Sequence, residues 1–86
     1  MTTPRHALDH PTEAPFYGDD VQHLLNQFEY SHLPPHLAEV SRPHSELAHA
    51  MAGGLFPGPE LLVGLRKLIE AKDCLVRQAV EDAKAE

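Results

Sequence analysis

The sequence predicts an all-α protein: a short N-terminal helix and then a two-helix antiparallel hairpin, assembled into a helical homo-oligomer. Residues 59–85 contain no proline after the first position, and their apolar residues recur every three or four positions, which is helical spacing. Residues 35–52 show the same spacing, and the short loop that joins the two segments favours antiparallel neighbours. The apolar face of 59–85 is wider than one partner helix can cover, so we expect self-association.

The helix expected over 59–85 has a clear start. Gly58 suits the N-cap position and Pro59 the first helical position, where a missing N–H costs nothing. Two stripes form its apolar face: Leu61, Leu65, Leu68, Lys72, Leu75 and Ala79 in one, and Leu62, Ile69, Val76 and Val80 in the other. Gly64 lowers helix propensity, and we interpret it as a point of close approach by a neighbouring helix rather than as a tolerated cost.

Charged residues in this helix predict two ion pairs at i,i+4 spacing, Arg66 with Glu70 and Asp73 with Arg77. Cys74 is the only cysteine, so neither an intramolecular disulfide nor a cysteine-based zinc site can form. We expect Cys74 to be a small core residue in a protein of the reducing cytoplasm.

Length and charge limit the function. The chain has 86 residues and a formal net charge of -6, which indicates one small domain and argues against binding of DNA or RNA polymers. A small anionic ligand in a local basic pocket remains compatible with this charge. No apolar run is long enough to cross a membrane, so we expect no membrane partner.

We expect the chain to divide into a flexible N-terminal tail, 1–18, and a helical oligomerising domain, 19–86. The tail holds three prolines and no periodic apolar stripe, which is typical of a segment without fixed structure. A helix is expected from about 20 to 28, capped by Asp19 or Asp20. Its apolar face consists of Val21, Leu24, Leu25 and Phe28.

Residues 28–35 place two aromatic residues before two prolines, which favours an extended segment. Tyr30 presents a ring with a polar tip, which suits a nucleobase or a partner surface. The alternative is that Phe28 and Tyr30 pin the loop to the helices.

The helix expected over 35–52 contains Pro43, which removes the hydrogen bond to the Glu39 carbonyl. Either one kinked helix continues through Pro43, or a first helix ends near Val40 and Ser41 caps a second one. We prefer the continuous helix because one stripe spans the stretch, and we expect a left-handed glycine cap at 53–54. The stripe consists of Leu37, Val40, His44, Leu47, Ala48 and Met51.

The sequence holds no recognisable catalytic or cofactor site. Of its seven histidines only His32 and His36 have i,i+4 spacing, and Pro34-Pro35 lies between them. A zinc site usually needs three or four ligands, so we interpret the histidines as ordinary surface or packed residues. His44 or His49 with Glu46 could perform acid–base work, but such pairs are common by chance. We therefore expect no enzyme activity, no cofactor and no metal.

One constellation remains, Tyr30 with Arg42 and the pair Arg66-Lys67, which are an aromatic residue and three cations in an acidic chain. Aromatic rings stack on bases, and arginine forks bind phosphate. The alternative is that Arg42 and Arg66 are solvated surface charges.

The order of these residues resembles that of the phage anti-CBASS cyclic-oligonucleotide sponges, and also that of small actinobacteriophage proteins with an LRKLxEAKD helix. The similarity covers about residues 28–80. The matching positions are Phe28, Tyr30, His32, Pro34, Glu46-Leu47-Ala48, Pro57 or Pro59, Glu60, and Lys67-Leu68-Ile69-Glu70-Ala71.

This resemblance implies a compact homohexamer that binds cyclic di- or trinucleotides at subunit interfaces without cleaving them, in the cytoplasm of the host cell. The host's immune effector then loses its signal. The family's stacking tyrosine falls on Tyr30 and a cationic residue falls near Arg42. The ligand-binding residues expected on this basis are Tyr30, His32, Arg42, Ser45, Arg66, Lys67 and Arg77.

The chain departs from the family near the end of the last helix. Val76 replaces an asparagine and Glu81 replaces an arginine, and an acid at that position would repel phosphate. Arg77, one turn earlier, is the expected substitute. The alternative function is an oligomeric helical interaction module, or an inhibitor of a host protein, with no small-molecule ligand.

Overall fold

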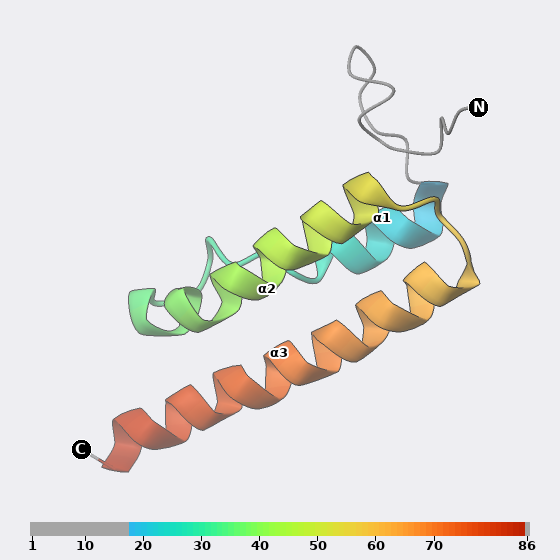
Figure 1. The fold of residues 1–86 in the computed structure, drawn as a ribbon. Coiled ribbons are helices and arrows are strands. Elements are labelled where there is room, and N and C mark those ends of the chain that lie inside the picture. The colour runs from blue at the N-terminus through green and yellow to red at the C-terminus, as the bar shows by residue number, and fades with distance from the viewer. Residues whose placement is uncertain (1–17, 86) are drawn as a thin grey trace.

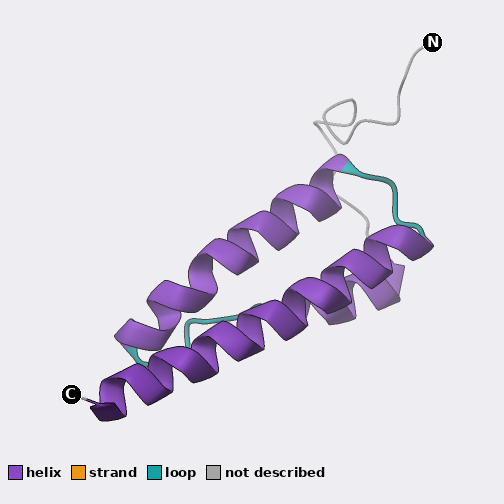
Figure 2. Ribbon diagram, turned by 60° about the horizontal axis from the view of Figure 1, so that its bottom comes forward, coloured by secondary structure: helices purple, strands orange, loops and turns teal. Residues whose placement is uncertain are grey.

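The computed structural model describes residues 18–85, and this part of the chain forms three helices (Figure 1). They are α1 (Gly18–Asn26), α2 (Pro35–Gly54) and α3 (Pro59–Ala85). Helices α2 and α3 form an antiparallel hairpin, and α1 lies against the hairpin near the loop at 55–58 (Figures 1 and 2). The all-α prediction is confirmed for these residues, whereas the predicted tail lies outside them except for Gly18, the first residue of α1.

The described helices differ from membrane spans. Each of them is either too short or too polar to cross a lipid bilayer.

The hydrophobic core lies where α1 meets the hairpin. The predicted apolar face of the first helix is confirmed, because Val21, Leu24, Leu25 and Phe28 are all buried. The helix itself ends at Asn26, and Phe28 follows in a turn in which its N–H donates to the Leu25 carbonyl at 3.0 Å. The core is completed by Ala48 and Ala52 of α2 and by Leu61, Leu65 and Ile69 of α3.

Helix α2 turns a different face inward from the one that its apolar spacing predicts. The buried residues are Ser41, Ser45, Ala48 and Ala52, so Ala48 alone belongs to the predicted stripe. Small side chains on this face leave room for the bulky residues of α1 and α3, which is how facing layers reach dense packing. Of the predicted stripe, Leu47 and Met51 are 47% and 43% exposed, whereas Leu37, Val40 and His44 are half-buried. We call Val40, His44, Leu47 and Met51 the outer stripe.

The preferred continuous helix through Pro43 is confirmed, since α2 runs unbroken from residue 35 to residue 54. The predicted left-handed glycine cap is wrong. Leu55 ends the helix in an extended conformation, with φ -126° and ψ 153°, and its N–H donates to the Met51 carbonyl at 3.1 Å. Because this bond satisfies one of the last free carbonyls of α2, no left-handed residue is needed there.

The bounds predicted for the last helix are confirmed, but its inward face is narrower than predicted. Leu61, Leu65 and Ile69 are buried, and Leu62 and Leu68 pack beside them. Leu75 is 49% exposed and Cys74 is also exposed, so Cys74 is not a core residue. The chain beyond residue 70 extends past α1, which is too short to cover it (Figure 1).

Gly64 and the predicted ion pairs of α3 also differ from expectation. A Cβ atom at Gly64 would meet nothing within 4 Å, so no helix of the described chain approaches it closely. Asp73 pairs with Lys72 at 2.9 Å rather than with Arg77. Arg66 and Glu70 form no ion pair among the described residues, which fits the weak preference of exposed charges for any one partner.

Lys72 joins α3 to the end of α1. Its Nζ donates to the Gln27 carbonyl at 2.9 Å and lies 5.8 Å from the centre of the Phe28 ring. The side chain is 12% exposed, because its aliphatic part covers the core while its charge reaches the last turn of α1. A positive charge at the C-terminal end of a helix is favourable.

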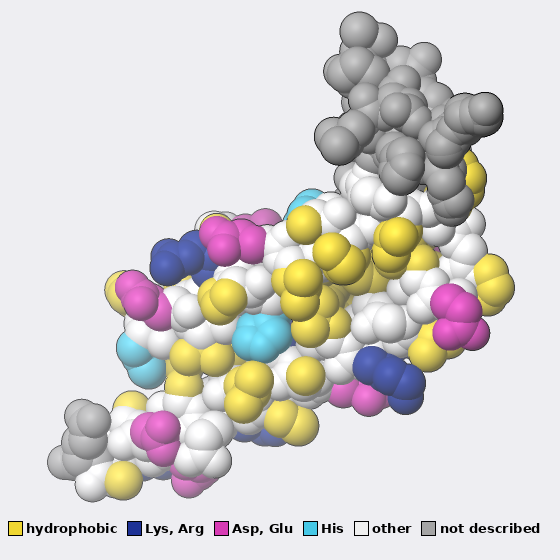
Figure 3. All heavy atoms as spheres, viewed as in Figure 1, with side chains coloured by type: hydrophobic (Ala, Val, Ile, Leu, Met, Phe, Trp, Pro, Cys, Tyr) yellow, Lys and Arg dark blue, Asp and Glu magenta, His cyan; other side chains and the backbone are white. Residues whose placement is uncertain are grey.

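Hydrophobic side chains gather over α2 and α3 on the face shown in Figure 3, with a histidine among them. In the same view α1 lies behind α2 (Figure 1). The large exposed apolar residues of the two hairpin helices are Leu47, Met51, Val63 and Leu75.

Candidate functional site

The loop between α1 and α2 is held by its first aromatic residue. Phe28 is fully buried, whereas Tyr30, two residues later, is half-buried. The loop is not simply extended as predicted, because the Leu33 N–H donates to the Tyr30 carbonyl at 3.0 Å and closes a turn. Phe28 therefore anchors the loop in the core, and Tyr30 stays partly exposed.

Glu29 lies between these two aromatic residues and organises the turn. Its carboxylate accepts hydrogen bonds from the Ser31 hydroxyl and from the Ser31 N–H, the latter at 3.0 Å. These bonds hold the pKa of Glu29 below its usual value, and the nearby imidazoles of His32 and His49 lower this pKa further. His49 belongs to α2, so its electrostatic effect on Glu29 acts between the loop and this helix.

In α2, Ser45 and His49 are about one helical turn apart and interact with each other. The Nδ1 atom of His49 lies 2.9 Å from the Ser45 carbonyl oxygen and 3.5 Å from the Ser45 hydroxyl. Since a carbonyl only accepts, Nδ1 is the protonated nitrogen, and Nε2 remains for other partners. Ser45 is buried and His49 is exposed.

Arg42 lies on the same side of α2 as His49, because seven residues make about two helical turns. Its guanidinium is exposed, and its Nε lies 3.9 Å from a carboxylate oxygen of Glu46. We use the name loop–α2 edge for residues 29–32 of the loop together with Arg42, Ser45 and His49 of α2; within residues 18–85 no hydrogen bond or ion pair joins Arg42 to the loop. Four of the seven predicted ligand-binding residues belong to it: Tyr30, His32, Arg42 and Ser45.

The other three predicted residues are exposed on α3. Arg66 and Lys67 project in different directions, because consecutive helical residues are about 100° apart. Arg77 donates from Nη2 to the Cys74 Sγ at 3.3 Å. No hydrogen bond or ion pair in the described part of the chain connects these three cations to the loop–α2 edge.

The proposed acid–base pairs of His44 or His49 with Glu46 do not form. The Nδ1 atom of His44 lies 2.9 Å from the Val40 carbonyl, as that of His49 does from the Ser45 carbonyl, while Glu46 faces Arg42. Within residues 18–85, no three His, Cys, Asp or Glu side chains are grouped to hold a metal ion.

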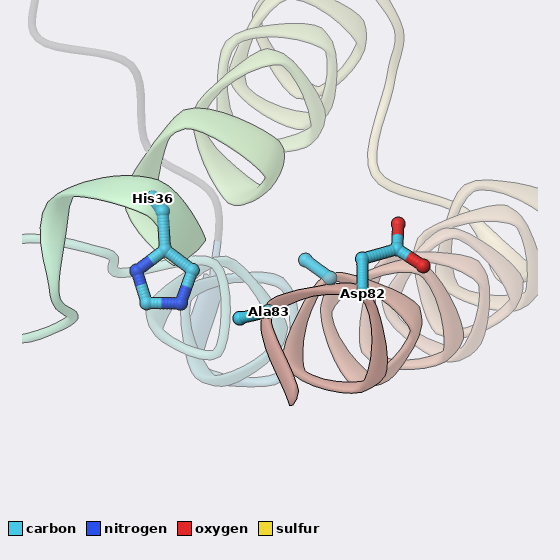
Figure 4. A pocket seen from close by; sticks show the side chains of 4 residues that line it. His36, Asp82 and Ala83 are labelled. Atoms are coloured by element: carbon cyan, nitrogen blue, oxygen red, sulfur yellow. The ribbon is translucent and has the colours of Figure 1, made fainter. Parts of the chain in front are cut away.

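Sequence reasoning missed a pocket of about 330 Å³ between the first turn of α2 and the last turns of α3 (Figure 4). His36, Ala79, Asp82 and Ala83 line it. His36 and Asp82 do not point toward each other (Figure 4), and Asp82 accepts a hydrogen bond from Gln78 at 2.8 Å. Only the register of α2 against α3 brings these residues together, so no local motif could have indicated the pocket. Its two polar side chains do not converge on a common point.

Sequence reasoning also missed His49 and Glu29 as members of the loop–α2 edge. The alternation of an aromatic residue, an acid and a second aromatic residue at 28–30 was the available signal.

Comparisons with models of known protein families, with curated proteins and with solved structures found no match to this chain. The family resemblance based on short motifs therefore stays a prediction.

Proposed function

We propose that this protein is a phage anti-defence sponge that binds cyclic oligonucleotide messengers without cleaving them and so blocks CBASS-type immunity of the host. One observation carries the proposal. Tyr30 is half-buried in a loop anchored by the buried Phe28, and Arg42 is exposed on α2, the helix that follows this loop. An aromatic ring for a base and a guanidinium for a phosphate are the two groups that a nucleotide requires.

Binding without cleavage fits the chemistry of the edge. Ser45 is the hydroxyl nearest to His49, but it is buried, and Nδ1 of His49 already carries the proton that it donates to the Ser45 carbonyl. This nitrogen cannot accept a proton from the hydroxyl, so the pair does not form the nucleophile and base that hydrolysis would use. We therefore expect the bound messenger to leave unchanged.

The ligand site is completed by a second copy of the chain, in a homohexamer. Exposed apolar residues of the outer stripe, such as Leu47 and Met51, favour association, since large exposed apolar surfaces in small proteins mark interaction sites. The exposed cations Arg66, Lys67 and Arg77 reach the ligand from neighbouring copies in this arrangement. Within residues 18–85 of one chain no hydrogen bond or ion pair joins them to the loop–α2 edge, which is the reason for assigning them to another copy.

Isothermal titration with cyclic di- and trinucleotides tests the proposal. Tyr30→Ala is expected to weaken binding by roughly ten- to a hundredfold, because stacking on one base contributes about 1–3 kcal/mol. Tyr30→Phe keeps the ring and serves as the matched control, so it is expected to retain most of the affinity. Equal affinity in wild type and Tyr30→Ala would contradict the assigned site, and recovery of linear nucleotide after denaturation would contradict the sponge.

The exposed outer stripe also favours a second candidate, an interaction module for a protein partner with no small-molecule ligand. A thermal-shift panel of cyclic nucleotides separates the two functions. A ligand of the folded state raises the melting temperature, whereas an interaction module would melt at the same temperature with every nucleotide.

A further inference from the structure

The first half of α2 is held less firmly than the second half. The residues that α2 buries before position 48 are Ser41 and Ser45, whereas its contributions to the apolar core are Ala48 and Ala52. Residues 35–47 therefore bury no apolar side chain completely. Since apolar burial is the dominant force that holds a helix on its neighbours, this half of α2 has little to retain it.

Ser41 places a polar group without a partner in this part of the helix. The residue is completely buried, and no group within residues 18–85 forms a hydrogen bond with its hydroxyl. A buried hydroxyl that lacks a hydrogen bond destabilises the conformation that buries it. A rearrangement that brings Ser41 into contact with water removes this cost.

Pro43 removes a helical hydrogen bond from the same turn. It has no N–H, so the Glu39 carbonyl lacks the bond that residue 43 donates in a regular helix. Arg42 precedes the proline, and a residue in that position prefers an extended backbone to the helical one that it has in α2. Pro43 would suit, in contrast, the first position of a separate helix. Ser41 and Pro43 thus give two independent reasons for α2 to break here.

The segment before this turn also packs loosely on α3. A pocket of about 330 Å³ separates the first turn of α2 from the last turns of α3 (Figure 4). His36, Ala79, Asp82 and Ala83 line it. Pro34 gives α2 no side-chain cap, and the first turn of α2 contains no acid, so this helix start has neither of the two groups that commonly stabilise one.

We propose that α2 contains a hinge at residues 41–43, and that residues 35–40 leave α3 in a less populated open state while residues 43–54 stay helical. In the open state Arg42 is extended, Pro43 begins the remaining helix, and Ser41 reaches water. A helical segment of six residues is not stable alone in water, so residues 35–40 lose their helical hydrogen bonds when they leave α3. Such a local opening requires less free energy than global unfolding.

The hinge divides the candidate site into two parts. Tyr30 and His32 precede it in the chain, whereas Ser45 and His49 follow it. Because Phe28 keeps the start of the loop in the core, opening repositions the end of the loop together with the first part of α2, and it widens the pocket between α2 and α3. The hinge needs no ligand and therefore does not depend on the proposed function.

Hydrogen exchange of backbone amides tests the hinge, on the full chain at one protein concentration. In a regular helix the amides of residues 39–42 donate to the carbonyls of residues 35–38, so they exchange whenever the hinge opens. The amides of residues 49–52 belong to the part that stays helical, and they exchange only through larger unfolding. We expect the first group to exchange about tenfold faster than the second, or more.

Pro43→Ala restores the missing N–H donor and is expected to slow the exchange of residues 39–42 by about tenfold or more. Gly64→Ala is the control, because residue 64 is helical in both states and a Cβ atom there meets nothing within 4 Å. It stabilises the fold against global unfolding, so it is expected to slow residues 49–52 and not residues 39–42. If Gly64→Ala slows both groups equally, residues 35–40 open only with the whole fold and α2 has no hinge.

Ser41→Ala tests the second cause of opening, with Ser45→Ala as its control. Both serines are buried on α2, but the Ser45 hydroxyl lies 3.5 Å from Nδ1 of His49. Ser41→Ala removes the unpaired hydroxyl and is expected to slow the exchange of residues 39–42 by roughly five- to tenfold, whereas Ser45→Ala is expected not to slow it. Equal rates in wild type, Pro43→Ala and Ser41→Ala would overturn the inference, as would equal slowing by the two serine substitutions.

Discussion

Lys72 offers a direct test of how α1 is held on the hairpin. Its ammonium donates to the Gln27 carbonyl at 2.9 Å and lies 5.8 Å from the centre of the Phe28 ring, and its side chain is 12% exposed. Lys72→Met keeps an unbranched apolar stem of similar length and removes the charge. The substitution therefore separates the polar contacts from the packing.

The expected loss follows from these contacts. A hydrogen bond to a charged group contributes about 1.5–3 kcal/mol, and a partly exposed cation–π contact about 0.5–1 kcal/mol. Two facts reduce the expected loss. The contact between the ammonium and the Phe28 ring, at 5.8 Å, is near the limit of its range. Water can also reach the Gln27 carbonyl after the substitution, since Gln27 is exposed. The ion pair of Lys72 with Asp73 lies near the surface and adds little to the free energy of unfolding. We therefore expect a loss of about 2 kcal/mol, which is a large part of the stability of a small domain.

Urea unfolding at matched protein concentration measures this loss, because association makes the stability depend on concentration. Lys67→Met is the control, since Lys67 is exposed on the same helix and makes no ion pair or hydrogen bond in the described structure. It is expected to change the free energy of unfolding by less than about 0.5 kcal/mol. If Lys72→Met unfolds at the same urea concentration as wild type, Lys72 does not hold α1.

Three further predictions concern other parts of the molecule. Leu47→Asp is expected to dissociate the proposed oligomer while each chain stays folded, because Leu47 is 47% exposed. Sedimentation velocity measures the dissociation and circular dichroism the folding of the chain. An intact oligomer would show that the outer stripe is not the interface. Gly64→Ala is expected to raise the free energy of unfolding by up to about 1 kcal/mol, since a Cβ atom at Gly64 meets nothing within 4 Å. A lower melting temperature of the variant in a thermal scan would place a neighbouring copy against Gly64. Ser31→Ala is expected to raise the pKa of Glu29 toward its usual value, as an NMR titration of the carboxylate can measure. Because the pKa of Glu29 is lowered in the folded state, the Glu29–Ser31 contact stabilises the fold at pH values above the usual glutamate pKa. This stabilisation is lost as the pH falls through the lowered pKa. An unchanged Glu29 pKa in Ser31→Ala would contradict the assigned cause.

Helical spacing predicted the number, order and approximate bounds of the helices, because this spacing is a local property of the chain. It could not decide which face of α2 points inward. Two stripes of α2 satisfy the same period, one with Leu47 and Met51 and one with Ser41 and Ala48. Hydrophobicity favours the first, but the bulk of Phe28 and Leu65, which are both buried, requires small neighbours. Only the three-dimensional packing of all three helices resolves the choice.

The candidate site was predictable only where its residues lie close together in the sequence. Tyr30 and His32 share a short segment with a local motif, and Arg42 and Ser45 follow on one helix. The electrostatic effect of His49 on Glu29 joins residues that are far apart in the sequence, so it depends on the tertiary fold and not on a local motif. The pocket at His36 and Asp82 likewise depends on the register of two helices.

The burial of Phe28 links the candidate ligand loop to the unfolding of α1. Tyr30 follows Phe28 by two residues, and Phe28 remains in the core only while α1 is packed on the hairpin. Local opening that releases α1 must then release the loop as well, so the two segments form one cooperative unit of hydrogen exchange. A ligand that contacts Tyr30 should therefore slow the exchange of amides in α1, which it never touches. Protection at Leu24 and Leu25 would then report that the loop is occupied.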